Sequence, residues 1–423
     1  MKLTTPGVIE TTAGHRCMQC GNEDKIYFCQ YTSTIFQKEI IYCRRCIQLG
    51  RMDNITNYRI TESVGKVSEG YYELPFQLSE QQSYASTQII EAINQGKNLL
   101  LYAVTGAGKT EMMFEGISVA RQLGLNVAVI SPRVDVVIEI SKRIKEAFIH
   151  EDIDVLHQSS YQQYNAHFII ATVHQLFRFK SHFDVIFIDE VDAFPLSMDV
   201  QLQGAIALAS KTKHSHIFMT ATPPKHLLHQ IQMDHIIKLP ARFHRHPLPE
   251  PIFRYFKLKP SRAQYKLKTL LLKQVSAQRF TLVFFNNIEL MLKAYDSYHY
   301  FFPDLICVSS EDALRFDKVE ALRRGEHTIV FTTTILERGF TMAQLDVIVI
   351  NADTFEKAAL VQIAGRVGRK QEAPTGIVLF LHEGVSLAMI QAKRDIKQMK
   401  TRQSERLDQC IDVFSVYNPS GKP

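Results

Sequence analysis

The sequence contains no tryptophan and only seven cysteines among its 423 residues. It also has no apolar run approaching the ~18–20 residues of a membrane-spanning helix. Its first residues, MKLTTPGVIETT, lack the apolar core of a signal peptide. We therefore expect a cytosolic protein, in which thiols stay reduced and disulfide bonds are rare.

Length and charge narrow the class of protein further. Apolar residues make up 46% of the chain, so its 423 residues can bury more than one core. Because domains average ~100–200 residues, we expect two large domains and a small one. The net charge of +6 is compatible with a polyanionic partner, although many basic proteins bind no nucleic acid.

The character of the sequence changes along the chain. The first 60 residues are rich in turns and carry most of the cysteines, and the next stretch shows no clear periodicity. From residue 78 onward, apolar strand-like runs alternate with amphipathic helix-like runs, which is typical of parallel sheets covered by helices. The proline-rich stretch 239–251 interrupts this alternation. We therefore predict a small module (1–60), a linker (61–77) and two α/β domains (78–240 and 241–423).

Each α/β domain is predicted to contain five strands. In the first domain they span residues 98–103, 126–131, 167–171, 184–188 and 216–220. In the second domain they span residues 279–285, 305–308, 328–332, 345–350 and 376–380. Two short strands, 26–30 and 39–42, are predicted within the small module.

A glycine-rich loop follows the first of these strands, where residues 103–110 read AVTGAGKT and lead into a helix-like run. Its backbone N–H groups and the helix N-terminus are suited to binding phosphate. Lys109 would reach the β- and γ-phosphates of ATP, and Thr110 would ligate Mg²⁺. The alternative is an ordinary strand-to-helix turn that contains glycines by chance and binds no phosphate. The loop residues assigned to nucleotide binding are Thr105, Gly106, Ala107, Gly108, Lys109 and Thr110.

A second signal is a strand that ends in acidic residues, where 184–192 read DVIFIDEVD. Asp189 would hold Mg²⁺, directly or through water. Glu190 would orient and deprotonate the water that attacks the phosphate. An acidic loop that caps a strand would look similar by itself, but its place after the glycine-rich loop favours nucleotide hydrolysis.

Two weaker signals belong to the same predicted site. The Gln82 amide offers the donor and the acceptor that an adenine edge requires, although helix capping by Ser79 explains this segment equally well. The tripeptide Thr220-Ala-Thr222 follows a predicted strand. Its hydroxyls are expected to contact the 189–192 loop and to relay the state of the nucleotide.

The second domain carries Arg366 and Arg369 within residues 362–369, QIAGRVGR. An arginine delivered from a second domain stabilises charge that develops on a γ-phosphate, so we assign this role to Arg369, with Arg366 as its close partner. A solvated, structural helix end is the alternative. Before them, the threonine-rich loop within 331–340 suits contacts to the phosphate backbone of nucleic acid, and Gly339 would permit a close approach.

Four cysteines form two Cys-x-x-Cys pairs that are separated by 22 residues, and these are Cys17, Cys20, Cys43 and Cys46. Two such pairs predict a tetrahedral Zn²⁺ site. Because so small a segment lacks a core, the metal would supply its folding energy. A redox dithiol is the alternative, for which one pair would suffice. Cys29 and His15 are further candidate ligands, but neither has a paired spacing.

Taken in order, AVTGAGKT, DEVD, TAT, TTTILERGF and QIAGRVGR resemble the motifs of superfamily 2 helicases. The resemblance covers residue 78 to about residue 410. It implies an α/β fold of two tandem RecA-like lobes that clamp ATP and move along nucleic acid. It also implies backbone contacts to nucleic acid from 131–133, 171–174 and 332–334, with Arg133 as the leading candidate. Recognition would then be largely independent of base sequence.

A Cys₄ module directly before such a motor, with DEVDAFP at 189–195, is similar to the ComFA family, the competence ATPases of bacterial DNA uptake. The resemblance implies a cytosolic motor at the inner face of the membrane that binds single-stranded DNA. Such a motor would help to pull one strand through a membrane channel protein. It also implies association with ComFC, a phosphoribosyltransferase-like protein, and with the recombination mediator DprA. Oligomer formation stays open.

Three alternatives compete with this interpretation. One is an RNA helicase or a helicase like PriA, whose zinc cysteines lie within its second lobe and whose acidic motif usually ends in His, unlike Asp192 here. Another is a nucleotide-gated scaffold that does not hydrolyse ATP, although the four residues expected to catalyse hydrolysis are all present. In the third, the zinc module is the main DNA-contacting element, through Arg44, Arg45 and Arg51. The basic stretch 257–273 is interpreted as an ordinary amphipathic helix and not as a dedicated DNA or membrane surface. For the similarly basic stretch 392–406 two interpretations stay open, a lining of the strand path and plain surface.

Overall fold

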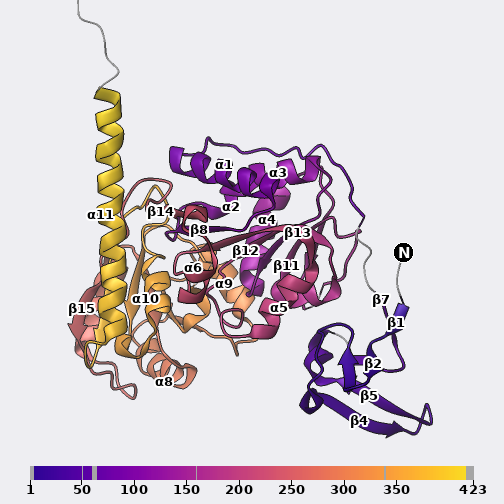
Figure 1. The fold of residues 1–423 in the computed structure, drawn as a ribbon. Helices are drawn as coiled ribbons and strands as arrows, with labels where there is room; N and C mark the ends of the chain where they lie inside the picture. The colour runs from indigo at the N-terminus through magenta and orange to yellow at the C-terminus, as the bar shows by residue number, and fades with distance from the viewer. Residues whose placement is uncertain (1–3, 50, 60–63, 159, 338–339, 416–423) are drawn as a thin grey trace, which may run out of the picture. The chain divides into compact units, whose positions relative to one another are not determined.

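A computed structural model describes the chain in five stretches, which are residues 4–49, 51–59, 64–158, 160–337 and 340–415. Figure 1 shows a small all-β part near the N-terminus and larger parts in which strands and helices alternate. The chain forms two compact units: residues 1–102 with 109–238, and residues 103–108 with 239–423.

The N-terminal module consists of short antiparallel strands. Its strands are β1 (Thr4–Pro6), β2 (Val8–Thr11), β3 (Gly14–Cys17), β4 (Phe28–Ser33), β5 (Lys38–Cys43), β6 (Met52–Asp53) and β7 (Asn57–Arg59). β1 pairs with β7, β2 pairs with β3, and β4, β5 and β6 form a three-stranded sheet. Its buried core consists of two aliphatic side chains, Val8 and Ile41, and three of the four paired cysteines. So small a core contributes little stability by itself.

Residues 64–76, called the strap below, form neither helix nor strand but lie along the first lobe. Arg121 is buried there, and its Nη2 donates to the Lys66 carbonyl oxygen at 2.9 Å. Its Nε also pairs with Glu151 at 3.2 Å. The Tyr72 ring of the strap stacks on Phe148 with centroids 5.4 Å apart. The strap is therefore fixed to the lobe by main-chain hydrogen bonds and an aromatic contact. The buried Arg121–Glu151 pair lies within the lobe and holds the Arg121 side chain that binds the strap.

The first lobe is built on a seven-stranded sheet in the order β10-β11-β9-β12-β13-β8-β14. Its strands are β8 (Leu99–Ala103), β9 (Val127–Ser131), β10 (Ile153–Leu156), β11 (Phe168–Thr172), β12 (Phe183–Asp189), β13 (Ser210–Thr220) and β14 (Ile236–Leu239). The pairs that join β10 through β8 are all parallel. Because helices cover a parallel sheet on both faces, β9 and β11 are buried along their whole length.

The helices of this lobe are α1 (Glu80–Gln95), α2 (Lys109–Met112), α3 (Phe114–Gln122), α4 (Val134–Ala147), the 3₁₀ segment η3 (Val173–Arg178), α5 (Val200–Ala209) and α6 (Lys225–Gln230). Right-handed crossovers place α3 and α4 on one face of the sheet, and η3 and α5 on the other. Figure 1 shows α1 and α3 on one side and α5 on the other. Both faces are therefore covered.

The second lobe contains a six-stranded parallel sheet in the order β15-β20-β19-β16-β18-β17. Its strands are β15 (Ile252–Tyr255), β16 (Phe280–Phe284), β17 (Ile306–Val308), β18 (Ile329–Thr332), β19 (Leu345–Val349) and β20 (Val378–His382). Its core includes Leu271, Val283 and Phe331, which contribute one side chain each from a helix and two neighbouring strands.

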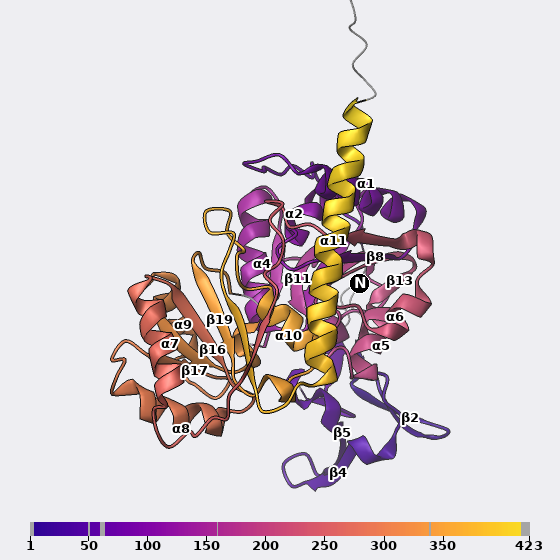
Figure 2. The same cartoon turned by 90° about the vertical axis from the view of Figure 1, so that its left-hand side faces the viewer.

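The helices of the second lobe are α7 (Tyr265–Ser276), α8 (Ile288–His299), α9 (Arg315–Arg323), α10 (Lys357–Ala364) and α11 (Leu387–Ser415). Figure 2 shows α11 as one long helix that runs beside α10, and the two helices pack together. Among the described residues, no helix combines the length and the apolar character that crossing a membrane requires.

All ten strands predicted for the two α/β domains are present, and so are both module strands. In the two lobes, β10, β14 and β15 were not predicted from the sequence, and each is an edge strand of four residues. The short module strands β1, β2, β3, β6 and β7 were not predicted either. The interpretation of residues 257–273 as one helix was wrong at its start, because α7 begins only at Tyr265.

Candidate active site and metal centre

The glycine-rich loop joins β8 to α2, and Gly106 and Gly108 both have positive φ angles, of 83° and 77°. Residues with a Cβ rarely adopt this conformation, so glycine allows the tight turn. Helix α2 begins at Lys109, and the side chain of Thr110 is buried in its first turn. The loop thus presents backbone N–H groups at a helix start, an arrangement suited to binding phosphate.

Lys109 lies beside the acidic end of β12. Its Nζ is 3.1 Å from Oδ1 of Asp189, and both side chains are largely buried. Because the strand order places β8 and β12 on either side of β13, their carboxyl ends meet at one edge of the sheet. The structure therefore brings together the lysine assigned to the phosphates and the carboxylate assigned to Mg²⁺.

Glu190 directly follows β12 and adopts a left-handed backbone conformation, with φ of 55°. This conformation is uncommon for residues other than glycine, and such strained positions are concentrated at functional sites. Glu190 thus lies one residue from Asp189 at the end of a buried strand. A rigid strand end is well suited to holding a general base.

The hydroxyls of Thr220 and Thr222 both donate to Asp192, at 2.5 Å to Oδ1 and 2.5 Å to Oδ2. The predicted contact between the Thr-Ala-Thr tripeptide and the acidic loop is therefore confirmed. It links the ends of two adjacent parallel strands, β13 and β12. Movement of the acidic loop would consequently displace the segment that follows β13.

Gln82 lies in the first turn of α1, where its Oε1 accepts hydrogen bonds from the Ser79 backbone N–H at 2.9 Å and from the Ser79 hydroxyl at 3.0 Å. This is a capping box, the structural role that the sequence analysis weighed against adenine binding. The side chain is buried. Its assignment to adenine stays a prediction.

In the second lobe, Arg366 and Arg369 have different surroundings. The buried Arg366 guanidinium donates to the Glu337 carbonyl oxygen, from Nε at 2.8 Å, and also to the Phe340 carbonyl oxygen. Arg369 donates from Nη1 to Thr341 Oγ1 at 3.2 Å. Arg366 thus binds main-chain carbonyls in the C-terminal part of the threonine-rich segment. Gly339, which we assigned to phosphate binding, lies outside the described residues.

Arg242 is a residue of the second compact unit that the sequence analysis did not single out. Its guanidinium is only 2% exposed and binds four main-chain carbonyl oxygens. The acceptors and their distances are Thr105 O at 3.2 Å, Gly365 O at 3.1 Å, Val367 O at 2.7 Å and Gly368 O at 2.6 Å. Among the described residues it has no carboxylate partner, and burial lowers its pKa to about 9. One side chain thus joins the glycine-rich loop to the QIAGRVGR segment.

The glycines of that segment have a steric role. A Cβ at Gly365 would overlap the Thr105 side chain, and a Cβ at Gly368 would overlap the Pro374 carbonyl. Gly368 also has a positive φ of 67°. Both positions therefore require glycine for close backbone packing around Arg242.

The residues expected to contact nucleic acid lie at strand ends. Ser131 ends β9 and pairs in register with Thr172, which ends β11. Arg133 follows as the N-cap residue of α4. In the second lobe, Thr332 ends β18 and is buried. The predicted contacts of the first lobe are thus neighbours along one sheet edge.

The four cysteines of the module converge, and their sulfur atoms all lie within 4.8 Å of one another. The Sγ atoms of Cys17 and Cys46 are 3.6 Å apart, and those of Cys20 and Cys43 are 3.7 Å apart. A tetrahedron with Zn–S bonds of about 2.3 Å has edges of about 3.8 Å. The sulfur cluster therefore fits a tetrahedral metal ion such as zinc.

Neither Cys29 nor His15 belongs to this cluster. Among the described residues, the four cysteines are the group of potential ligand side chains that lie close enough together to hold a metal ion. Contacts among the four thiols lower the pKa of Cys43 and raise that of Cys46. Crowded thiols of this kind are readily deprotonated when a metal ion binds them.

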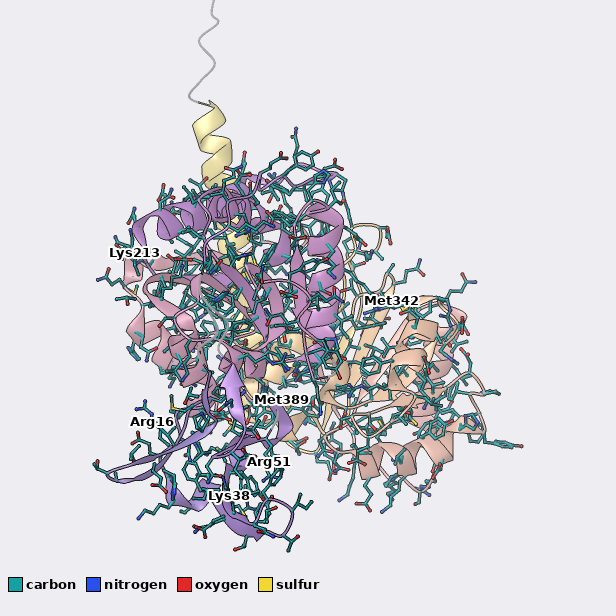
Figure 3. The ribbon with its side chains drawn as sticks, turned by 90° about the vertical axis from the view of Figure 1, so that its right-hand side faces the viewer. Arg16, Lys38, Arg51, Lys213, Met342 and Met389 are labelled. Atoms are coloured by element: carbon teal, nitrogen blue, oxygen red, sulfur yellow. The ribbon has the colours of Figure 1, made fainter. Side chains whose placement is uncertain are left out.

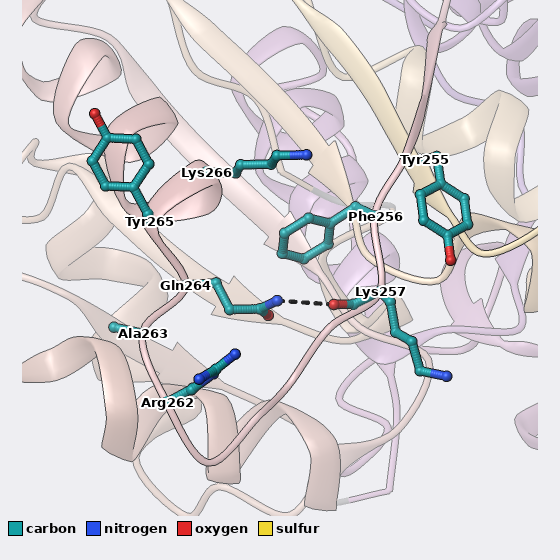
Figure 4. Close-up of a pocket in the computed structure, with 8 residues that line it drawn as sticks. All are labelled: Tyr255, Phe256, Lys257, Arg262, Ala263, Gln264, Tyr265 and Lys266. Atoms are coloured by element: carbon teal, nitrogen blue, oxygen red, sulfur yellow. Dashed lines mark hydrogen bonds between the residues drawn. The ribbon is translucent and has the colours of Figure 1, made fainter.

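The second lobe also contains a cavity of about 480 Å³ between β15 and the start of α7. Figure 4 shows its lining, in which the Gln264 amide donates to the Lys257 carbonyl oxygen at 2.9 Å. No residue assigned to the nucleotide or metal sites lines it. The lining residues are Tyr255, Phe256, Lys257, Arg262, Ala263, Gln264, Tyr265 and Lys266.

Three family models match successive parts of the chain. Residues 2–59 match the competence protein ComFA N-terminal domain. Residues 75–225 match the model described as "Type III restriction enzyme, res subunit". Residues 264–371 match the helicase conserved C-terminal domain.

Whole proteins match over most of their length. The competence protein ComFA of Bacillus subtilis is 37% identical over 91% of this chain and 85% of its own length. That of Streptococcus pneumoniae is 35% identical over 88% of this chain and 90% of its own length. The solved structure of S. cerevisiae Dbp5 bound to RNA and ADP BeF3 covers 76% of this chain and 88% of its own, with a TM-score of 0.59 at 12% identity.

Two parallel-sheet lobes, a phosphate-binding loop paired with an acidic strand end, and matching helicase domains define an ATPase of the superfamily 2 helicase type. Within that class the relatives at 35–37% identity extend over nearly the whole chain. The chain belongs to the ComFA family of competence proteins.

Proposed function

We propose that this protein is an ATPase and translocase that is stimulated by single-stranded DNA and drives the import of one DNA strand during competence. The observation that carries the proposal is the pairing of Lys109 with Asp189, next to Glu190 at the end of the same strand. Family membership supports the competence role.

In this proposal each residue of the first lobe has one task. The glycine-rich loop and Lys109 bind the phosphates of ATP, and Thr110 and Asp189 supply oxygen ligands that suit Mg²⁺. When bound, Mg²⁺ neutralises charge on the phosphates. Glu190 orients the attacking water and accepts its proton. Gln82 would additionally read the adenine edge.

Arg369 is our candidate for stabilising the charge that develops during phosphoryl transfer. Its guanidinium donates to Thr341 at 3.2 Å and to the Gly365 carbonyl at 3.3 Å. Arg366 binds main-chain carbonyls more closely, so it would position the segment that carries Arg369.

We also propose that the module binds zinc through Cys17, Cys20, Cys43 and Cys46. In the cell the motor would act at the inner face of the membrane, beside the channel protein that admits DNA. ComFC and DprA are the proposed protein partners.

The test is steady-state ATP hydrolysis by the purified protein without nucleic acid, and with single-stranded DNA, duplex DNA or single-stranded RNA at constant salt. Single-stranded DNA should stimulate hydrolysis most strongly. Lys109→Ala should abolish ATP binding and hydrolysis. Glu190→Gln should keep ATP binding but lower kcat at least about 100-fold, as expected for loss of a general base.

Other outcomes would contradict the proposal. Equal or greater stimulation by RNA would identify an RNA helicase. ATP binding without hydrolysis, in the presence of any nucleic acid, would leave a nucleotide-gated scaffold. Movement along DNA is tested separately, by displacement of streptavidin from the biotinylated end of a single strand.

A further inference from the structure

The three-stranded sheet of the N-terminal module has two different faces. The register of β4 and β5 places Tyr31 and Tyr42 on one face, and Phe28, Ile41 and Cys43 on the other. The second face packs into the core around the four cysteines. The first face, called the tyrosine face below, points away from that core, so its side chains are not needed to enclose the metal site.

The tyrosine face is organised around one arginine. Arg51 Cζ lies 5.3 Å from the ring centroid of Tyr31 and 5.1 Å from that of Tyr42. The two rings are 6.2 Å apart and nearly perpendicular, at 75°. Arg51 Nη2 also donates to the Tyr31 hydroxyl at 2.6 Å. The Tyr31 ring is therefore held in place while 39% of the residue stays exposed.

This face is also positively charged. The register places Lys38 on it, and both Lys38 and Arg51 are exposed (Figure 3). The neighbouring carboxylate is Asp53, which is buried, lies 3.1 Å from Arg51 and accepts hydrogen bonds from two backbone N–H groups. Arg44 follows β5 and is exposed as well. The exposed groups around the rings are thus cations.

We propose that the tyrosine face binds about one or two nucleotides of single-stranded DNA, with a base stacked on Tyr31 and phosphates bound by Arg51 and Lys38. The proposal rests on the proposed function, because it adds a second contact for the same strand. Stacking on an exposed ring needs an accessible base plane, which unpaired strands offer and duplexes do not. The fixed ring loses little freedom on binding, which favours affinity.

The absence of tryptophan from the chain provides a direct test. A Tyr31→Trp variant of the full chain, loaded with zinc, would carry a single tryptophan on this face. Base stacking should quench its fluorescence when oligo(dT) is added. A matched variant, Tyr300→Trp, places the probe at another exposed tyrosine, 85% exposed, in the second lobe. Its fluorescence should stay unchanged.

Removal of the face should weaken binding. Tyr31→Ala combined with Arg51→Gln should lower the affinity for oligo(dT) by about tenfold, measured by fluorescence anisotropy. Hydrolysis without DNA and the zinc content should not change. Arg16→Gln is the matched control, because Arg16 is an exposed module cation on β3 whose partner is Glu23. It should keep normal affinity.

The outcomes separate this proposal from the proposed function. Stimulation of hydrolysis by single-stranded DNA with no quenching at position 31 would overturn the tyrosine face and leave the motor intact. Quenching at position 31 without any stimulated hydrolysis would support the face and contradict the motor. Equal quenching by duplex DNA, or quenching by RNA alone, would overturn the proposed ligand.

Discussion

Arg242 is a buried cation whose acceptors are all main-chain carbonyl oxygens, contributed by the glycine-rich loop and the QIAGRVGR segment. The planar guanidinium donates to three carbonyl oxygens of the QIAGRVGR segment, so a positive charge alone would not reproduce these contacts. We infer that it sets the position of the Thr105 loop relative to that segment.

We therefore expect Arg242→Lys to lower kcat for ATP hydrolysis about 10- to 100-fold, because lysine keeps the charge but cannot bridge all four oxygens. The thermal unfolding midpoint should fall only slightly. Arg262→Lys, at an exposed arginine of the same unit, is the matched control. An unchanged kcat in the Arg242 variant would show that the bridge has no part in positioning.

The sequence could not reveal Arg242, because its four partners lie more than 120 residues away along the chain. It sits in a proline-rich stretch that carries no motif of its own. By contrast, Lys109 and Asp189 were recognisable because each belongs to a local strand-loop pattern whose parallel sheet then brings the ends together. Residues in local sequence motifs could therefore be predicted, whereas a side chain that binds residues far away along the chain could not.

At the scale of elements, we propose that zinc bound by the sulfur cluster stabilises the module. Cys43→Ser removes one of the four proposed sulfur ligands, so we expect loss of zinc and of the fold of the module. Zinc release, followed with a chromogenic chelator, and rapid proteolysis of the module would measure this. ATP binding by the lobes should persist. A folded, protease-resistant module without metal would contradict the structural role of the cluster.

The strap is a second element whose stability can be tested. Arg121→Met would leave Glu151 buried without its cation, which costs about 3–5 kcal/mol of unfolding free energy. Lys66→Met removes an exposed pair between the strap and Asp152 of the lobe and should cost about 1 kcal/mol or less. Urea unfolding of both variants gives the comparison. An equal loss of unfolding free energy in the two variants would mean that the buried Arg121–Glu151 pair contributes no more to stability than the exposed Lys66–Asp152 pair.

The elements that the sequence analysis missed share a physical cause. Interior strands of a parallel sheet are covered on both faces and therefore carry continuous apolar runs, as β9 and β12 do. The edge strands β10, β14 and β15 are only four residues long and include charged side chains. Such segments resemble loops in sequence. The strap likewise has no periodicity, because its contacts are made with a surface already formed by other residues.

For the molecule as a whole, two buried histidines connect stability to pH. Burial lowers the pKa of His182 to about 4 and that of His216 to about 3. In the unfolded chain the pKa of histidine is about 6.5, so the unfolded state binds more protons below that pH. Stability is therefore fully present above about pH 6.5 and is lost as the pH falls.

Between pH 6.5 and 5 each histidine should cost about 2 kcal/mol of unfolding free energy. Urea unfolding at pH 7 and pH 5, followed by circular dichroism, would measure the loss. A His182→Gln, His216→Gln double variant should show a smaller loss, which separates these histidines from other titrating groups. An identical pH dependence in the two proteins would contradict the assignment.

The strap has one more consequence, for the reach of the N-terminal module. Only residues 60–63 separate β7 from the strap, and a fully extended chain from Arg59 to Val64 spans at most about 18 Å. A tether so short sets the effective concentration of the module near the first lobe in the millimolar range or above. In the function that we propose, a DNA strand released by one of the two would therefore be rebound by the other before it diffuses away, even with weak individual contacts.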